Sequence, residues 1–210
     1  IKMQIINKKI LEDKKNNKLI NLNLGSGNEN LTDYYNCDIK NEKNIDIVCD
    51  LNNKLDLIPD NTVANIYSNQ TFEHINNLTG LISEIVRISS NKARCKFIVP
   101  HFANPYYYSD PTHVRQFGLY TFHYFVKSNN QWIRKVPNYL TMNEIELINT
   151  EIIFYRNTVF ENLFNPFIQK IINLNRYLQD FYEKKLCWIY PPSNLIFEIK
   201  RYLNLSCFKN

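Results

Sequence analysis

Short apolar runs that stop abruptly at polar residues or glycine constrain the fold of this chain more than any other feature. The runs are LINLNL (19–24), YYNCDI (34–39), IDIVCDL (45–51) and VANIYSN (63–69). Continuous apolar runs of this length are typical of strands that are buried on both faces. They predict a mostly parallel sheet covered by helices, which is a doubly wound α/β fold.

After residue 69, the spacing of the apolar residues becomes typical of a helix and then again of a strand. NLTGLISEIVRISS (77–90) repeats its apolar residues at helical spacing, and a fifth buried strand follows at 95–99. Residues 103–140 have neither period and are rich in aromatic residues, which favours a long functional loop. The remaining expected elements are a strand within 144–156, a helix over 160–185 that Pro166 either breaks or begins, and a last antiparallel edge strand at 194–203.

We therefore expect one domain over 1–210. Its expected parts are an amphipathic or frayed leader (1–18), a core (19–102), an insertion (103–140) and C-terminal strands and helices (141–210). The net charge of +5 comes from scattered basic residues, so it does not favour nucleic-acid binding. The five cysteines are widely spaced and include no C-x-x-C pair, which favours a reduced, cytoplasmic setting.

The first apolar run ends in a glycine turn, Gly25-Ser26-Gly27, and the next two end near Asp38 and Asp50. Glycines let a backbone approach a ligand closely, and open α/β sheets bind ligands at the carboxyl ends of their strands. A carboxylate on the second strand can accept hydrogen bonds from ribose hydroxyls, and one on the third can accept from an adenine amino group. A dinucleotide fits less well, because Asn30 stands where G-x-G-x-x-G needs glycine.

Together, LNLGSGNENLTDYYNCDI, IVCDLN, IPDNTVANIYSNQTFEHI and FIVPHFANPYYYSDPTHVRQF resemble small class I S-adenosylmethionine-dependent methyltransferases of bacterial surface-polysaccharide clusters. The P-H-F and D-P-T-H motifs are the narrowest part of this resemblance. It covers about residues 19 to 125 and resumes weakly near the end of the chain. It implies methyl transfer from S-adenosylmethionine to a hydroxyl of a sugar or nucleotide-sugar, with N-methylation of an amino sugar left open.

The resemblance also implies a set of cofactor-binding residues. Gly25 and Gly27 would border the methionine part, Asp38 the ribose, and Asp50 the adenine. The full expected set is Asn23, Gly25, Ser26, Gly27, Asp38, Ile39, Asp50, Leu51, Asn69 and Gln70. The chain departs from the family pattern at Asn23, where many relatives have an acid or another polar residue, and at Asn28, which replaces a third glycine.

Titratable and aromatic residues gather just after the fifth strand. His101 and His113 have the pKa range that suits a general base, and Asp110 can orient an imidazole. Tyr106 and Tyr107 are expected to bind the acceptor, together with Arg115, which can hold an anionic group. The expected acceptor wall also includes Tyr108, Phe117, Tyr120, Phe122, Tyr124 and Trp132, with a small core under the loop as the alternative.

For the other histidines a structural role is expected: His74 packs or caps near a helix start, and His123 packs among aromatic rings. A metal site formed by His101, Asp110 and His113 lacks compact ligand spacing, so no metal is expected. The aromatic helix predicts a core or dimer face, or a peripheral contact with a membrane that carries lipid-linked glycans.

Two other functions remain open. Asn23 and Asn28 favour a degenerate, non-catalytic member of the fold that binds a nucleoside or a protein. A nucleotide-sugar oxidoreductase would need a Tyr-x-x-x-Lys pair. In YTFHYFVK, Tyr124 lies three residues before Lys127 and Tyr120 seven, so neither tyrosine has that spacing.

Overall fold

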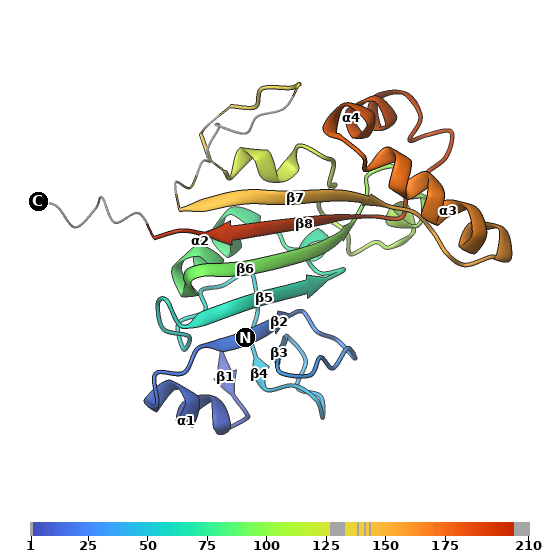
Figure 1. Ribbon diagram of the computed structural model, residues 1–210. Helices are drawn as coiled ribbons and strands as arrows, with labels where there is room; N and C mark the ends of the chain where they lie inside the picture. The colour runs from blue at the N-terminus through green and yellow to red at the C-terminus, as the bar shows by residue number, and fades with distance from the viewer. Residues whose placement is uncertain (1, 127–132, 138, 141, 143, 204–210) are drawn as a thin grey trace, which may run out of the picture.

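The computed structural model describes residues 2–126, 133–137, 139, 140, 142 and 144–203. Over these residues, the strands form one mixed sheet in the order β1-β4-β3-β2-β5-β6-β8-β7 (Figure 1). The strands are β1 (Gln4–Ile5), β2 (Ile20–Leu24), β3 (Tyr35–Asp38), β4 (Ile47–Val48), β5 (Val63–Asn69), β6 (Ser89–Pro100), β7 (Ile145–Ile153) and β8 (Asn194–Arg201). The helices are α1 (Lys9–Lys15), α2 (Leu78–Ile88), α3 (Val159–Ile172) and α4 (Arg176–Lys185), with 3-10 turns η1 (Phe72–His74), η2 (Pro105–Ser109) and η3 (Thr121–Tyr124).

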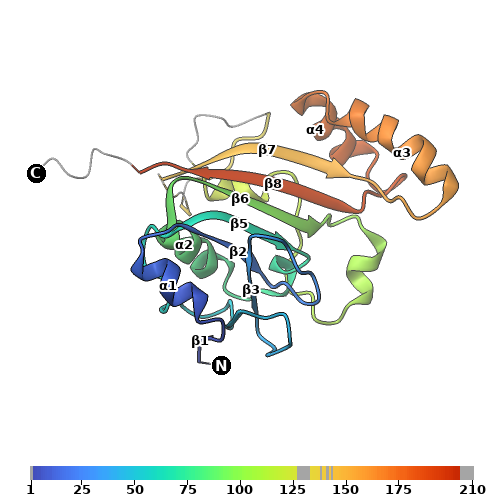
Figure 2. The same ribbon diagram turned by 60° about the horizontal axis from the view of Figure 1, so that its bottom comes forward.

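Strand order and direction confirm the predicted α/β, doubly wound fold. β2 pairs in parallel with β3 on one side and with β5 on the other, while β4 and β6 extend the parallel part. The strand order therefore reverses at β2, which is the topological switch point where such sheets bind ligands. In Figure 2, α3 and α4 gather near the end of β7, on the opposite side of the view from α1 and α2.

The last strand is antiparallel, as expected, but the prediction that it is an edge strand is wrong. β8 lies between β6 and β7 and pairs antiparallel with both, so that β7 is the edge. Its side chains alternate between buried and half-buried along the strand, and residues of β6 and β7 pair with it from one end to the other. At the other edge, β1 pairs with β4, and Met3 and Ile10 are buried, so the expected leader contributes to the sheet and to the core.

The long C-terminal helix differs from its prediction in two ways. A capping box between Thr158 and Glu161 starts α3 before Pro166, and the helix continues through this proline. The break comes instead at 173–175, between α3 and α4. Most apolar residues of α3 are also exposed rather than part of a core face: Val159 is 87% exposed, Leu163 69% and Phe167 66%, while Ile168 and Ile172 are partly buried against the core.

A tight turn at Gly25 joins β2 to the loop at the switch point. Its φ of +66° is in the left-handed region, where residues with a side chain are strained. A Cβ at this position would lie 2.2 Å from Cγ2 of Thr71. Gly27 also has a positive φ, +50°, but a Cβ there would meet no atom within 4 Å. Gly25 is therefore required for conformation and for space, and Gly27 for conformation alone.

The outer edge of β7 is covered by side-chain amides of α3 and α4 rather than by another strand. The Asn173 side chain accepts from the Ile152 N–H (2.9 Å) and donates to the Ile152 carbonyl (2.8 Å). Gln179 donates to the Thr150 carbonyl at 2.7 Å, and Gln169 accepts from the Phe154 N–H at 3.4 Å. These bonds satisfy backbone groups that would otherwise be a template for pairing with another chain.

We expect Gly25→Ala to lower the free energy of unfolding by about 1–3 kcal/mol through backbone strain, and by a similar further amount through overpacking against Thr71. The control, Gly27→Ala, should lose only the strain part. In a double-mutant cycle followed by urea denaturation, Thr71→Gly should restore the overpacking part of the Gly25→Ala loss. Equal losses in the two alanine variants would contradict the close contact.

We expect Asn173→Ala to lower the free energy of unfolding by about 1–3 kcal/mol, because it leaves two backbone groups of the edge strand without their partner. Thermal unfolding followed by circular dichroism measures this. Asn41→Ala, at an exposed position, is the control and should change stability by less than about 0.5 kcal/mol. An Asn173 variant as stable as that control would show that the amides do not stabilise the edge.

Candidate functional site

The glycine turn and the first expected aspartate meet at the carboxyl ends of β2 and β3. The Gly27 N–H donates to Oδ2 of Asp38 at 2.9 Å, and the Lys40 N–H donates to its Oδ1 at 3.0 Å. Each carboxylate oxygen keeps a further lone pair, so the oriented carboxylate can still accept from two hydroxyls. Ile39, next along the chain, is exposed at the same edge.

The second expected aspartate follows β4 and is held in the same manner. Asp50 Oδ1 accepts from the N–H and the side chain of Asn52, and Oδ2 accepts from the side chain of Asn53 at 2.9 Å. Leu51 is buried beside it. Both carboxylates are thus fixed by local hydrogen bonds at one edge of the sheet.

Two polar side chains beneath the turn are buried and incompletely hydrogen-bonded. Asn23 is fully buried and donates to Oδ1 of Asn36 at 3.1 Å, but its own Oδ1 has no hydrogen-bond partner within the described chain. The same holds for the Ser26 hydroxyl, which is also buried. Such groups are rare without a role, because a buried polar atom without a partner costs about 1–3 kcal/mol.

At the tip of β5, Asn69 is half-buried and Gln70 is exposed with a φ of +51°. The Gln70 side chain donates to Oδ1 of Asn194, the first residue of β8, at 3.0 Å. Gln70 lines a cavity of about 540 Å³ together with Tyr106 and Asn194. The remaining lining residues are Asn104, Ile153, Phe154, Tyr155, Arg156, Asn157, Gln169 and Ser193. This cavity thus lies between the tip of β5 and the adjoining ends of β7 and β8.

His101 is fully buried, and both of its ring nitrogens are hydrogen-bonded. Nδ1 accepts from the Ala103 N–H at 3.0 Å, so Nε2 carries the proton and donates to Oε2 of Glu183 at 3.1 Å. The same glutamate oxygen accepts from the Leu119 N–H at 2.8 Å. These contacts tie α4 to the start of the insertion, and they leave His101 no lone pair directed at a ligand.

His113 lies apart from His101 and beside Asp110 and His74. Its Nδ1 donates to the Tyr107 carbonyl at 2.8 Å, which leaves a lone pair on Nε2. Nε2 lies 3.7 Å from Oδ2 of Asp110. Hydrogen bonds from the hydroxyl and N–H of Thr112 lower the pKa of Asp110, so this carboxylate is charged at neutral pH.

Glu73 is a candidate site residue that the sequence reasoning did not single out. It follows β5, in TFEHI, and is fully buried with no hydrogen-bond partner for either carboxylate oxygen among the described residues. Desolvation raises the pKa of Glu73 to about 7 against the opposing effect of its own backbone N–H, and the Asp110 charge makes the smallest contribution, which also raises it. The sequence did contain a signal for it, because Glu73 is a charged residue between the end of a predicted strand and the start of a predicted helix.

The aromatic insertion divides between core and surface. Phe117, Phe122 and Tyr120 are buried in the main core, as the alternative interpretation expected. Tyr106 is 67% exposed, and its ring meets that of Tyr155 edge-on at 5.8 Å. Tyr107 is buried against His113. Trp132 lies outside the described residues.

Arg115, the cysteines and the helices complete the comparison with the sequence-based predictions. Arg115 Nη2 donates to the Asn76 carbonyl at 3.0 Å, while its buried Nε has no hydrogen-bond partner in the described residues. Cys37, Cys49, Cys95 and Cys187 are buried free thiols. None of the described helices is both long and apolar enough to cross a bilayer.

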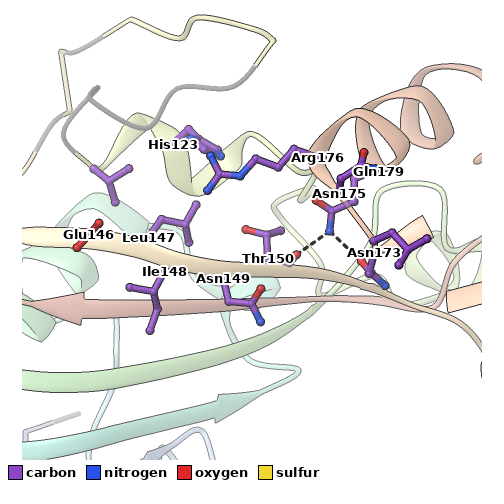
Figure 3. A pocket seen from close by; sticks show the side chains of 12 residues that line it. His123, Glu146, Leu147, Ile148, Asn149, Thr150, Asn173, Asn175, Arg176 and Gln179 are labelled. Atoms are coloured by element: carbon purple, nitrogen blue, oxygen red, sulfur yellow. Dashed lines mark hydrogen bonds between the residues drawn. The ribbon is translucent and has the colours of Figure 1, made fainter. Parts of the chain in front are cut away.

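A second cavity, of about 330 Å³, lies outside the edge strand β7, between η3 and the start of α4 (Figure 3). Gln179 crosses it to bond the Thr150 carbonyl and Oδ1 of Asn173. None of the site residues expected from the sequence lines this cavity. It is therefore separate from the edge of the sheet where those residues gather.

No protein-family model and no curated protein sequence matches the chain. Among solved structures, a SAM-dependent methyltransferase from Archaeoglobus fulgidus is 16% identical, with 92% of each chain covered and a TM-score of 0.54. An S-adenosylmethionine-dependent methyltransferase from Mesorhizobium loti is 12% identical over 87% of this chain and 91% of its own, with a TM-score of 0.49. The first likeness, together with the strand order, shows that this chain has the class I methyltransferase fold.

Proposed function

We propose that this chain transfers a methyl group from S-adenosylmethionine to a small acceptor. The observation that carries the proposal is the oriented Asp38 carboxylate, which is fixed by Gly27 at the topological switch point of a methyltransferase fold. The cofactor's ribose would bind Asp38, its adenine would lie near Asp50 and Leu51, and its methionine part would lie over the glycine turn. The oxygens of Asn23 and Ser26 that lack partners support a polar ligand above them.

The acceptor class that we propose is a sugar or a nucleotide-sugar, as the resemblance to surface-polysaccharide methyltransferases implies. The cavity beside Gln70 supports it, because aromatic faces such as Tyr106 and amides such as Asn194 suit a ring with hydroxyl groups. The acceptor atom is a hydroxyl oxygen in this proposal, and the amine of an amino sugar is the alternative.

Of the three expected catalytic residues, we propose His113, supported by Asp110, as the group that acts on the acceptor. A hydroxyl nucleophile must lose its proton as the methyl group is transferred, and the Nε2 lone pair of His113 is available for such a step. His101 uses both nitrogens within the protein, so we propose that it positions the insertion. Tyr107 and Arg115 flank this acceptor side.

We propose a surface contact for the exposed apolar face of α3 and its neighbourhood. Its exposed members are Val159, Phe160, Leu163, Phe164, Phe167 and Ile171. Apolar surface of this kind marks interaction sites, here with a second copy or with a membrane that carries the acceptor. Sedimentation with and without lipid vesicles separates these two partners.

We expect S-adenosylhomocysteine to bind with micromolar affinity in calorimetric titrations, and Asp38→Ala to weaken binding at least ~10-fold. The reason is the loss of charge-assisted hydrogen bonds worth about 1.5–3 kcal/mol each. Asp56→Ala, which removes an exposed carboxylate elsewhere, should bind as the wild type does. NAD should not bind, and tight NAD binding would favour the oxidoreductase. A folded protein that binds neither ligand would contradict the cofactor assignment and favour a degenerate member of the fold.

Once an acceptor is found by screening sugars for S-adenosylhomocysteine release, we expect His113→Gln to lower kcat by about 10²–10⁴-fold while cofactor binding is retained. His101→Gln should instead lower thermal stability, because it breaks the buried link to Glu183. If His113→Gln keeps full turnover, a different group removes the acceptor proton.

A further inference from the structure

Three potential metal ligands meet at one point beside the proposed acceptor site. A ligand atom of each of Glu73, His74 and His113 lies within 4.8 Å of the other two. Glu73 and His74 belong to η1, which follows β5, while His113 comes from the insertion. The Val114 N–H donates to the Glu73 carbonyl at 2.9 Å and fixes the two segments side by side.

Hydrogen bonds determine which nitrogen of each imidazole carries a lone pair. The Thr112 hydroxyl donates its one proton to Oδ1 of Asp110 at 2.6 Å, so it must accept from Nδ1 of His74 at 2.9 Å. Nδ1 of His113 donates to the Tyr107 carbonyl. Both rings therefore carry their protons on Nδ1 and present Nε2 lone pairs. This is the arrangement of metal-binding histidines, whose second N–H is held by a carbonyl or by a carboxylate network.

The third potential ligand has no partner among the residues that the structure describes. Glu73 is 0% exposed, and neither of its carboxylate oxygens accepts a hydrogen bond from a described residue. A carboxylate removed from water is costly unless it is paired or bound to a metal. No ion pair with Glu73 is formed in the described part of the chain, so a cation that enters the cluster would be the partner of its ionised carboxylate.

We propose that Glu73, His74 and His113 bind one divalent transition-metal ion, with zinc as the best fit. Two imidazoles and one carboxylate are a set that zinc accepts in sites with an open fourth position, and imidazole suits it better than it suits magnesium or calcium. Ligand distances of about 2.0–2.2 Å require the three atoms to close in to roughly 3.4 Å from one another. His74, which is only half-buried, can supply this movement.

The inference goes beyond the proposed methyl transfer and is tested without it. If the acceptor hydroxyl fills the open position, the metal lowers the pKa of that hydroxyl. His113 would then be a ligand rather than a base. Metal-binding measurements test this site, and their result does not depend on whether S-adenosylhomocysteine binds.

The test is calorimetric titration of the chelator-treated, full-length protein with zinc chloride, with magnesium chloride as a second probe. We expect one zinc ion per chain at micromolar affinity or tighter, and no measurable magnesium binding. Glu73→Gln and His74→Gln should each weaken zinc binding at least 10-fold. Glu42→Gln, which removes an exposed glutamate charge elsewhere, should not change it. Thr112→Val, which removes the hydrogen bond that orients His74, should weaken binding about 10–100-fold.

Cobalt substitution provides an independent readout, because its visible absorption reports nitrogen and oxygen ligands and would reveal thiolate ligands. Circular dichroism confirms that each variant is folded. Zinc binding that Glu73→Gln and His74→Gln leave unchanged, a thiolate cobalt spectrum, or no zinc binding by the wild type would each overturn the site. Asp38→Ala should keep zinc while losing S-adenosylhomocysteine, so failure of the metal site and failure of the cofactor site are distinguishable.

Discussion

The turn at the end of β2 is the constraint on which the rest of the site depends. The N–H groups of Gly25 and Ser26 both donate to the carbonyl of Cys37, at 2.8 and 3.0 Å, which ties the turn to β3. From this fixed turn, Gly27 orients Asp38. Thr71, packed against Gly25, directs the chain that leaves β5 toward Glu73 and His74. One short segment thus places the groups that we assign to the cofactor and, through η1, those that we assign to the acceptor side.

The composition of the apolar runs predicts most of the strands, whereas only the structure shows which strands pair with each other. VANIYSN is apolar enough to predict β5 with its observed bounds, and the helical spacing of 77–90 predicts α2. The position of β8 inside the sheet is not encoded in its own residues, because a strand with one partner and a strand with two can share one pattern. In α3, the apolar residues predicted a buried or contacting face, and periodicity alone does not say which of these it is.

The candidate site was predictable where one segment holds both the residue and its orienting group, as at Asp38 and Asp50. Where the partner is distant in the chain, the sequence does not show which residues meet. His101 and His113 lie close in the chain, but one contacts Glu183 of α4 and the other lies beside His74. The polar side chains also differ in whether their atoms find hydrogen-bond partners. The Asn173 amide at the β7 edge bonds through both its oxygen and its nitrogen, while Asn23, Ser26 and Glu73 keep oxygens without a partner among the described residues, and stability alone does not account for these three.

The central place of β8 has a consequence for how the chain acquires its structure. β6 and β7 do not pair with each other, and the strand that joins them, β8, follows both of them in the chain. Until β8 leaves the ribosome, the apolar edge of β6 has no partner, and β7 with α3 and α4 has no place on the sheet. This part of the sheet is therefore completed only after β8 has been made, and until then the nascent protein exposes an unpaired strand edge of the kind that chaperones protect.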